Sequence, residues 1–423
     1  MNIPDLYKIF NENPIVTTDS RNCPKGSIFF ALKGERFNGN HYAKETIEKG
    51  CAYAIVDEIE YANGRNIIYV ENVLTTLQKL ANFHRNQLNI PIVGITGTNG
   101  KTTTKELIAS VLQRKYKTLY TQGNLNNHIG VPLTLLQLKN EHEIGIIEMG
   151  ANHPGEIKTL VEIVNPNYGI ITNVGKAHIE GFGSFEGVVK TKSELYDFLR
   201  NHNGTAFVNK ANEILMKSSK GISNVIYYGK DSDFESFMLN NNPFLELKWR
   251  NFCIKSKLIG SYNAENIMAA IAIGCYFSVK DDEIVKAIEE YTPTNNRSQY
   301  KKTEKNDLII DAYNANPTSM NASIDNFNQI ENDNKIVILG DMKELGEISD
   351  SEHQKVVDKL EKLNLCKILI VGSEFGKTET KKALKFTDIN DLNNYLVNEN
   401  FKNHLILIKG SNSMKLIECI NHL

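Results

Sequence analysis

The stretch from Gly94 to Thr104 has the residue types and spacing of a loop that binds phosphate groups. It runs Gly-Ile-Thr-Gly-Thr-Asn-Gly-Lys-Thr-Thr-Thr between an apolar run and a helix-like stretch, and this is the context that a phosphate loop requires. Its glycines let backbone N–H groups turn towards phosphate oxygens, Lys101 would reach the β- and γ-phosphates, and the Thr102 hydroxyl would bind Mg²⁺. The commonest motif has glycine where Ile95 stands, so we expect a variant loop. Kinases, GTPases, motors and ligases all use such a loop, so other residues must decide the reaction.

Glu148 ends one apolar run, 144–149, and His178 follows another, 168–174. The carboxyl ends of parallel strands meet at one edge of a sheet, so both side chains are expected near the phosphate loop. A carboxylate there would hold Mg²⁺, and a neutral imidazole could complete the metal's shell of ligands, although Mg²⁺ prefers oxygen. The alternatives are an ordinary glutamate at a strand end and a hydrogen-bonded structural histidine.

Two further segments carry polar groups that could serve the same site. Lys190 and Lys192 are two residues apart in a helix-like stretch, so they point to different faces and only one can face a site. Alternatively, both lie on a solvated surface. The segment from Gly123 to Pro132 is dense in amides, which suit recognition of a polar substrate but also suit a plain loop.

The elements that must position these residues alternate between strand and helix, which predicts an α/β fold with mainly parallel sheets. We expect three domains: a small N-terminal α/β domain (1–85), a central phosphate-loop domain with a parallel sheet flanked by helices (86–297), and a doubly wound, Rossmann-like C-terminal domain (298–423). The predicted strands are 27–32, 52–56, 66–70, 91–96, 144–149, 168–174, 307–311, 335–340, 366–372 and 404–410. The predicted helices include 41–49, 73–87, 101–115, 261–277 and 349–363, and the region 220–260 has hairpin-like character.

The composition excludes several classes of protein. The chain has 423 residues, 41% of them hydrophobic, which is ample for folded cores and excludes wholesale disorder. The 48 basic and 50 acidic residues give a net charge of −2, so we expect no nucleic acid partner. No apolar run approaches the length of a membrane span, and the first residues lack the order of a signal peptide. The six cysteines form no CxxC pair, which favours free thiols in the cytoplasm.

The chemical motifs occur in a distinctive order along the chain. They are Gly-Thr-Asn-Gly-Lys-Thr-Thr at 97–103, Gly-Asn-Leu-Asn-Asn at 123–127, Glu148 before Gly-Ala-Asn-His-Pro-Gly at 150–155, Thr-Asn-Val-Gly-Lys-Ala-His at 172–178, Lys192 before Ser-Glu-Leu, Ser-Tyr-Asn-Ala-Glu-Asn at 261–266, Asp-Ala-Tyr-Asn-Ala-Asn-Pro at 311–317, and Gly-Asp-Met-Lys-Glu-Leu-Gly at 340–346. Together they resemble the Mur ligase family over nearly the whole chain. The segments 151–155 and 311–317 resemble the members of that family that use D-alanyl-D-alanine.

The resemblance implies three domains, which bind a UDP-linked substrate, bind ATP, and close over ATP and the incoming amine. It implies that ATP phosphorylates the terminal carboxylate of a UDP-N-acetylmuramoyl-tripeptide, that D-alanyl-D-alanine attacks the acyl phosphate, and that the product serves peptidoglycan synthesis. It further implies a cytoplasmic monomer with ATP, two Mg²⁺ ions and no membrane insertion.

The resemblance also assigns roles to individual residues. The implied catalytic residues are Lys101, Lys192 and His178. The implied ATP contacts are Gly97, Thr98, Asn99, Gly100, Lys101, Thr102, Thr103, Asn263, Asn266, Arg297 and Asp311. The implied metal-site residues are Thr102, Glu148, His178 and Lys192, the last as a carbamate formed with CO₂. The implied substrate contacts are Ser20, Arg21, Phe37, Asn126, Asn127, Tyr313, Asn314 and Asn316.

Three other functions remain open on the sequence. One is a related amide ligase, either of another Mur type or of the folylpolyglutamate type, acting on a different amino acid. Another is a small-molecule phosphoryl transferase with the same phosphate loop, whose product would be a phosphate ester and which would need no amine. The third is a nucleotide-binding regulator without catalysis, which would have no need of Lys101, Glu148, His178 and Lys192 together.

Overall fold

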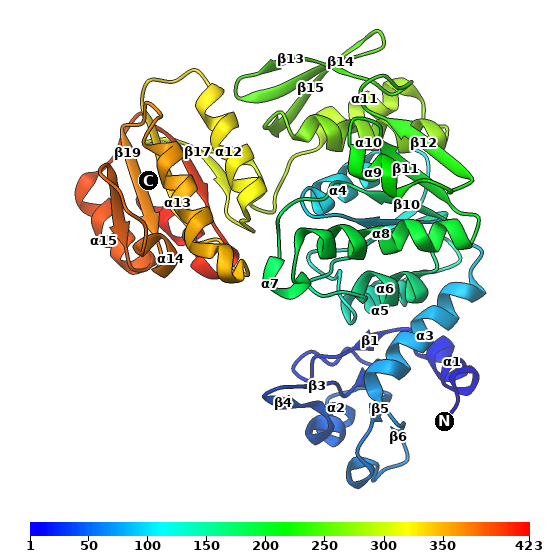
Figure 1. Cartoon of the computed structure of the whole chain (residues 1–423). Helices are drawn as coiled ribbons and strands as arrows, with labels where there is room; N and C mark the ends of the chain where they lie inside the picture. The colour runs from blue at the N-terminus through cyan, green and yellow to red at the C-terminus, as the bar shows by residue number, and fades with distance from the viewer.

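The computed structural model describes residues 1–423, which form three α/β units (Figure 1). In that view the N-terminal unit lies below the central unit, and the C-terminal unit lies beside it. The α/β class with parallel sheets flanked by helices is confirmed. The domain limits at residues 85 and 297 stay predictions. None of the helices combines the length and the apolar character that crossing a membrane requires.

The N-terminal unit contains a four-stranded parallel sheet in the order β1-β2-β5-β6. The predicted helix at 41–49 is shorter than expected, because a 3₁₀ turn at Gly39–Tyr42 takes its first residues. The elements are α1 (Ile3–Glu12), β1 (Val16–Thr17), β2 (Ile28–Phe30), β3 (Lys33–Gly34), β4 (Phe37–Asn38), α2 (Ala43–Glu48), β5 (Tyr53–Val56), β6 (Ile67–Tyr69) and α3 (Val73–Gln87).

The central unit contains a six-stranded parallel sheet in the order β12-β11-β10-β7-β9-β8, with helices on both faces. The hairpin-like region is a three-stranded antiparallel sheet, β13-β14-β15, but its first part joins the large sheet as β12 instead. The strands are β7 (Ile92–Thr96), β8 (Thr118–Tyr120), β9 (Ile144–Glu148), β10 (Tyr168–Ile171), β11 (Thr205–Asn209), β12 (Asn224–Tyr228), β13 (Phe237–Asn241), β14 (Phe244–Trp249) and β15 (Phe252–Ile259). The helices are α4 (Lys101–Leu112), α5 (Gly130–Leu135), α6 (Glu156–Val164), α7 (Ile179–Phe182), α8 (Phe185–Asn201), α9 (Glu213–Ser218), α10 (Asn263–Tyr276) and α11 (Asp281–Glu290).

The C-terminal unit has the expected doubly wound pattern, with strand order β16-β17-β21-β18-β19-β20. All its strands run parallel except the edge strand β16, which is antiparallel to β17. The elements are β16 (Gln299–Lys302), β17 (Asp307–Asp311), α12 (Pro317–Gln329), β18 (Lys335–Gly340), α13 (Ser349–Leu360), β19 (Lys367–Val371), α14 (Ser373–Gly376), β20 (Ala383–Phe386), α15 (Ile389–Glu399) and β21 (Leu405–Lys409).

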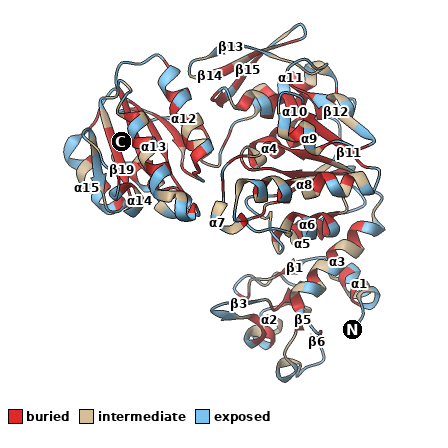
Figure 2. Cartoon of the chain, viewed as in Figure 1, coloured by how far each residue is buried: buried red, intermediate tan, exposed pale blue.

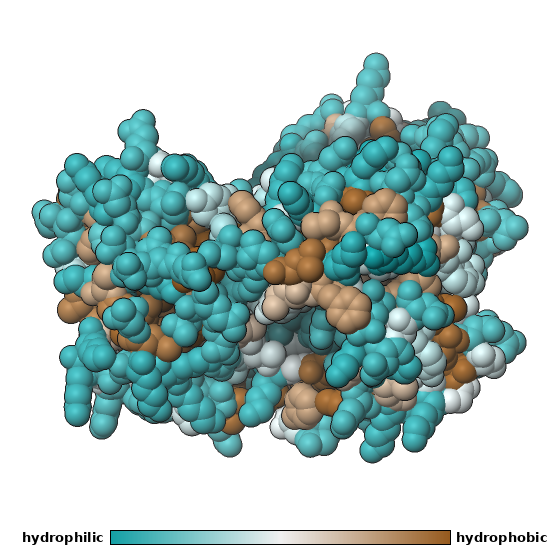
Figure 3. All heavy atoms as spheres, turned by 90° about the horizontal axis from the view of Figure 1, so that it is seen from above, coloured by the Kyte–Doolittle hydropathy of each residue, from teal (hydrophilic) through white to brown (hydrophobic).

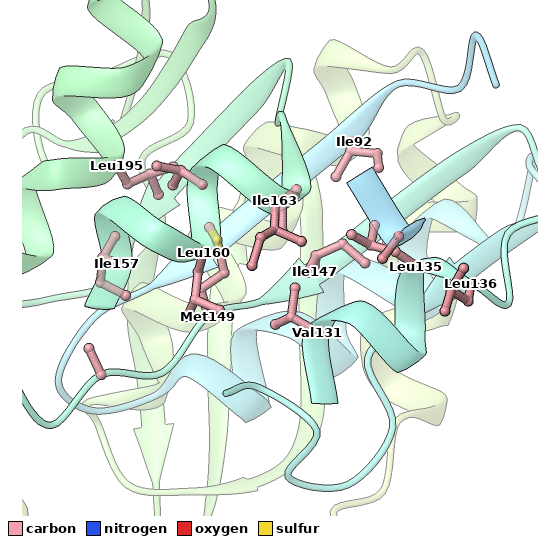
Figure 4. Close-up of a cluster of buried hydrophobic side chains, with 14 of the residues drawn as sticks. Ile92, Val131, Leu135, Leu136, Ile147, Met149, Ile157, Leu160, Ile163 and Leu195 are labelled. Carbon is pink, nitrogen blue, oxygen red and sulfur yellow. The ribbon is translucent and has the colours of Figure 1, made fainter. Parts of the chain in front are cut away.

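The N-terminal and central units share one hydrophobic core. A single cluster of buried side chains extends from α1 and α3 to α5, α6 and α8 on one face of the central sheet. Figure 4 shows part of it, where Val131 of α5 and Leu160 of α6 lie near Ile147 of β9. Burying each such side chain stabilises the fold by roughly 1.5–3 kcal/mol, so these two units are not readily separated.

The C-terminal unit has its own core and meets the central unit mainly through polar contacts. Of its buried clusters, one receives Ile259 from β15 and the other receives nothing from outside the unit. In Figure 2 the buried residues follow the sheets, while the outward faces of the helices are exposed. The face seen from above is mostly hydrophilic, with hydrophobic groups in small patches (Figure 3). This difference in packing favours motion of the C-terminal unit relative to a continuous N-terminal and central body.

Arg85 at the end of α3 also joins the first two units. Its guanidinium is buried and donates to the carbonyl oxygens of Val164, Leu88 and Asn165 and to Oδ1 of Asn167. Burial lowers the pKa of Arg85 to about 10. The arginine therefore satisfies four acceptors at the junction of the two units.

Candidate active site

A cleft of about 860 Å³, which we call the central cleft, lies where the three units meet. It is lined by the phosphate loop, by loops at the carboxyl ends of β9 and β10, by α3 from the N-terminal unit, and by β17, α12 and β21 from the C-terminal unit. In parallel sheets these strand ends are the usual place for ligands. The predicted site residues that line it are Thr98, Asn99, Gly100, Lys101, Thr102, Thr103, Asn126, Asn127, Glu148, His178, Asn263, Asn266, Arg297, Asp311, Tyr313 and Asn314.

The phosphate loop connects β7 to α4 and needs glycine at two positions. Gly97 has φ 140°, and a Cβ there would lie 2.1 Å from Oγ1 of Thr172. Gly100 precedes the helix with φ 77°. Ile95 is fully buried in β7, so it belongs to the strand, and the turn that needs glycine begins only at Gly97. This accounts for the variant spacing.

Lys101 begins α4, and its ammonium group turns back over the loop. Nζ donates to the carbonyl oxygens of Gly97 at 2.9 Å and Thr98 at 3.0 Å. Burial lowers the pKa of Lys101 to about 8, and the nearby Glu148 carboxylate partly opposes this. The positive charge therefore lies inside the loop where phosphate groups would bind.

Glu148 at the end of β9 has one oxygen with partners and one without. It is 1% exposed, and Oε1 accepts hydrogen bonds from Nδ2 of Asn126 at 2.8 Å and Oγ1 of Thr102 at 3.3 Å. Oε2 is buried with no hydrogen bond, and Nζ of Lys105 lies 3.8 Å away. A buried carboxylate oxygen without a partner is costly, and a divalent cation would satisfy it. Thr102 and Glu148 therefore fit a Mg²⁺ site.

The protein supplies few metal ligands of its own. No group of three or more His, Cys, Asp or Glu side chains is arranged to hold a metal ion. Mg²⁺ commonly keeps several waters and binds through one or two carboxylates together with substrate phosphates, so this sparse donor set fits that ion. Asn126 lines the central cleft, and its amide also donates to Glu148; its contact with substrate stays a prediction.

Lys192 is buried beside the central cleft, whereas Lys190 is exposed on the other face of α8. Nζ of Lys192 donates to the carbonyl oxygen of Ala151 at 3.1 Å and lies 5.2 Å from the centre of the Phe182 ring. Burial holds the pKa of Lys192 well below its usual range, and the charge of Lys101 acts in the same direction. The amine is therefore biased towards its neutral, nucleophilic form.

His178 links the central unit to the C-terminal unit. It has φ 51°, and its Nδ1 forms a hydrogen bond with the carboxylate of Glu344. Burial lowers the pKa of His178, while the Glu344 carboxylate opposes the shift. A second polar contact between the units joins Nδ2 of Asn316 to Oδ1 of Asn99 at 2.8 Å. These contacts hold the C-terminal unit against the phosphate loop.

Two asparagines of α10 form a hydrogen-bonded chain with α4. Nδ2 of Asn266 donates to Oδ1 of Asn263 at 2.8 Å, and Oδ1 of Asn266 accepts from Oγ1 of Thr104 at 2.9 Å. A Cβ at Gly100 would lie 2.6 Å from the same Oδ1. These hydrogen bonds therefore hold the first turn of α4 against α10.

The C-terminal unit presents a buried ion pair to the central cleft, and the chain that leads into this unit presents an arginine. Nζ of Lys409, 1% exposed at the end of β21, lies 2.5 Å from Oδ2 of Asp311, which also accepts from Oγ of Ser323 at 2.9 Å. The guanidinium carbon of Arg297 lies 3.9 Å from the centre of the Tyr313 ring. Charged and aromatic groups thus face the phosphate loop from across the cleft.

Some predicted residues lie outside this lining. Gly97, Lys192 and Asn316 adjoin it through their hydrogen-bonded neighbours. The N-terminal residues are separate: Ser20 is buried, Arg21 pairs with Asp19 at 2.9 Å, and Phe37 stacks on Tyr42. The structure therefore does not bring Ser20, Arg21 or Phe37 into the central cleft.

Sequence reasoning assigned no role to Lys105, Glu344 and Lys409. Lys105 could have been found, because a residue four positions after Lys101 on a helix lies on the same face. Lys409 ends an apolar run, which placed it at the edge where ligands bind. Glu344 lies in the 340–346 motif, but its pairing with His178 spans 166 residues, and no local signal reveals it.

Comparison with known proteins gives matches to protein families and to proteins of known name. Three family models match in order: Mur ligase family, catalytic domain (14–88), Mur ligase middle domain (95–274), and Mur ligase, glutamate ligase domain (296–412). The chain is 32% identical to the UDP-N-acetylmuramoyl-tripeptide–D-alanyl-D-alanine ligase of Bacillus subtilis, over 96% of this chain and 92% of that protein.

Solved structures agree over the same length. MurF from Acinetobacter baumannii is 31% identical with a TM-score of 0.87, covering 96% of this chain and 92% of that one. MurF from Thermotoga maritima in complex with ADP is 26% identical with a TM-score of 0.87, covering 97% of both chains. Three family models in sequence order and full-length relatives lead to one conclusion: the chain belongs to the Mur ligase family.

Proposed function

We propose that this protein is an ATP-dependent ligase that joins D-alanyl-D-alanine to UDP-N-acetylmuramoyl-tripeptide in the synthesis of peptidoglycan precursors. The observation that carries the proposal is the central cleft, where Lys101 and Glu148 face charged groups of the C-terminal unit. Relatives of nearly equal length carry the name of this activity. These relatives favour it over the other amide ligases and over simple phosphoryl transfer.

The reaction must first make a carboxylate carbon electrophilic. A carboxylate resists attack by an amine because its charge is delocalised and it has no leaving group. Transfer of the γ-phosphoryl group from ATP to the terminal carboxylate of the tripeptide gives an acyl phosphate and ADP. The amine of D-alanyl-D-alanine then attacks the acyl carbon, its nitrogen loses a proton, and the tetrahedral intermediate expels phosphate to leave the amide. Lys101 and the loop amides would offset repulsion between the triphosphate and the carboxylate.

Thr102, Glu148 and His178 are the residues that would hold Mg²⁺. Bound there, two Mg²⁺ ions would neutralise charge on the reacting phosphate and carboxylate groups. Oε2 of Glu148 supports this assignment, because it is buried and accepts no hydrogen bond, with only the Lys105 ammonium 3.8 Å away. An imidazole nitrogen is an unusual ligand for Mg²⁺, which prefers oxygen, so Thr102 and Glu148 are proposed as the principal ligands.

Lys192 is proposed to carry a carbamate formed with CO₂. The neutral amine attacks CO₂ and a proton leaves to solvent, so the neutral side chain becomes a carbamate anion that can serve the metal site. The burial that depresses the pKa of Lys192 supports this step. With ¹³C-labelled bicarbonate, the carbamate should give a carbonyl NMR signal that is absent in Lys192→Met. A wild-type protein without that signal contradicts the modification.

The remaining assignments follow the family resemblance. Asn263, Asn266, Arg297 and Asp311 are proposed to bind ATP, and Tyr313, Asn314 and Asn316 to face the acceptor. Ser20, Arg21 and Phe37 are proposed to bind the uridine diphosphate end, which would lie along the N-terminal unit. The protein is proposed to act as a monomer in the cytoplasm.

Release of ADP, measured with and without each half-substrate, tests the function. ADP should form only when the tripeptide substrate is present, and the amide product only when D-alanyl-D-alanine is added. Meso-diaminopimelate, L-lysine and L-glutamate as acceptors should give no amide, and Lys101→Ala should abolish ADP release. A stable phosphate ester without any amine, or amide formation with one of the other amino acids, would overturn the proposal.

A further inference from the structure

The chain between the central and C-terminal units is tied to the helix that follows the phosphate loop. Oη of Tyr291, directly after α11, donates to Oε2 of Glu106 at 2.6 Å. Nδ2 of Asn295 lies 3.2 Å from both carboxylate oxygens of the same glutamate. Glu106 is five residues past Lys101 on α4. One carboxylate on that helix therefore holds the linker at two points.

The linker carries Arg297 into the central cleft. The backbone on both sides of Arg297 has a conformation that the free linker would not adopt. The residues on either side, Asn296 and Ser298, have φ 56° and φ 50°, the left-handed region that residues other than glycine avoid. Oγ of Ser298 lies 2.7 Å from Oη of Tyr262, which fixes the far side. Two strained residues around one arginine require such ties to persist.

The side chain of Arg297 is held in place but keeps an unused donor. Its guanidinium lies against the ring of Tyr313, and Nε is buried with no hydrogen-bond partner. A buried N–H of this kind is costly unless a ligand satisfies it. The linker thus places an unsatisfied cationic donor in the same cleft as the phosphate loop.

We propose that Glu106 and Tyr291 are positioning residues that hold Arg297 at the nucleotide site through the linker. The ties fix the backbone before Arg297 relative to the phosphate loop, while its guanidinium packs on Tyr313 of the C-terminal unit. The inference rests on the proposed function in one respect, namely that Arg297 binds the nucleotide.

Tyr291→Phe in the full-length chain tests the inference, with Tyr116→Phe as a matched control. Oη of Tyr116 donates at 2.7 Å to the carbonyl oxygen of Phe277, so the control removes an equally short hydrogen bond that does not touch the linker. A hydrogen bond to a charged group is worth about a tenfold change in an equilibrium. We expect Tyr291→Phe to raise the Kd for ATP about tenfold and Tyr116→Phe to leave it unchanged.

A double-mutant cycle separates positioning from general loosening of the fold. In an Arg297→Ala background, adding Tyr291→Phe should change the Kd for ATP by less than about twofold, because the coupled groups act as one unit. A full tenfold loss in that background would show that the hydroxyl acts on the phosphate loop directly, and equal effects of the two tyrosine variants would show general loosening. Either result overturns the inference.

Limited trypsin digestion tests, without any nucleotide, whether Glu106 and Tyr291 hold the linker. We call this contact the brace. Cleavage after Arg297, followed by mass spectrometry, should be faster in Tyr291→Phe than in wild type or Tyr116→Phe. Suppose that cleavage is accelerated in Tyr291→Phe but that Arg297→Ala binds ATP as the wild type does. The assigned contact of Arg297 with ATP then fails, and the brace stands. If cleavage is not accelerated, the brace fails whatever the role of Arg297.

Discussion

Replacing Gly100 with alanine should lower the free energy of unfolding more than the same change at Gly155, which has a matched backbone conformation. Gly100 precedes α4 with φ 77° and ψ −4°, and Gly155 precedes α6 with φ 81° and ψ −7°. Neither helix has a side-chain cap at that position. The two sites differ in their surroundings: a Cβ at Gly155 meets nothing within 4 Å, whereas a Cβ at Gly100 lies 2.6 Å from Oδ1 of Asn266.

The two costs can be worked out separately. An L-residue in the left-handed region costs roughly 1–2 kcal/mol, and Gly155→Ala should lose about this much. Gly100→Ala should lose the same and also displace Asn266, whose side chain bonds to Thr104 at 2.9 Å and to Asn263 at 2.8 Å. At about 0.5–1.5 kcal/mol for each hydrogen bond, the extra loss is roughly 1–3 kcal/mol.

Urea unfolding followed by tryptophan fluorescence measures the difference directly. The chain has a single tryptophan, Trp249, which is fully buried in the central unit that contains both glycines. If the free energies of unfolding of the two variants agree within about 0.5 kcal/mol, contact with Asn266 is not the reason for glycine at position 100. In an Asn266→Ala background, the extra cost of Gly100→Ala should disappear.

Three further outcomes follow from contacts elsewhere in the fold. Glu344→Gln weakens a partly exposed hydrogen bond with His178 and should cost about 0.5–1 kcal/mol, so the C-terminal unit should open about two- to fivefold in equilibrium constant, seen as a larger radius of gyration in X-ray scattering; an unchanged or smaller radius contradicts this. Arg85→Ala leaves four acceptors without a donor and should cost about 3 kcal/mol or more by calorimetry, whereas a loss below about 1 kcal/mol would show that water replaces the guanidinium. Burial lowers the pKa of His84 below 6.5, so the unfolded chain binds the proton more tightly than the folded chain. The free energy of unfolding should therefore fall as the pH drops below 6.5. His84→Gln should show a shallower fall, and equal slopes of the free energy of unfolding against pH would refute this.

The parts of the site that local sequence predicted are those set by strand ends. Lys101, Glu148 and His178 follow apolar runs, and parallel pairing of β7, β9 and β10 brings those ends together. The glycines of the phosphate loop are equally local, because their φ angles are properties of a short turn. Burial of Lys192 in preference to Lys190 needed the family resemblance, since spacing alone could not choose between them.

Other elements carry no local signal of this kind. β11 is buried throughout, but Thr205 begins it and Asn209 ends it, so only three apolar residues follow one another in its sequence. The ties between Glu106 and Tyr291 and between His178 and Glu344 join residues 185 and 166 positions apart. Such pairs depend on how whole units pack, and periodicity within a segment cannot encode them.

The hydrogen bonds from the ammonium group of Lys101 to the carbonyls of Gly97 and Thr98 affect which anions the loop binds. The backbone carbonyls of the loop solvate the ammonium group, and these contacts hold the shape of the loop. An incoming anion must outcompete two well-placed neutral acceptors. A polyphosphate chain that also engages the helix start and the far wall can do so, whereas a lone orthophosphate gains little from the exchange. These contacts thus favour a polyphosphate over a single phosphate ion at this loop.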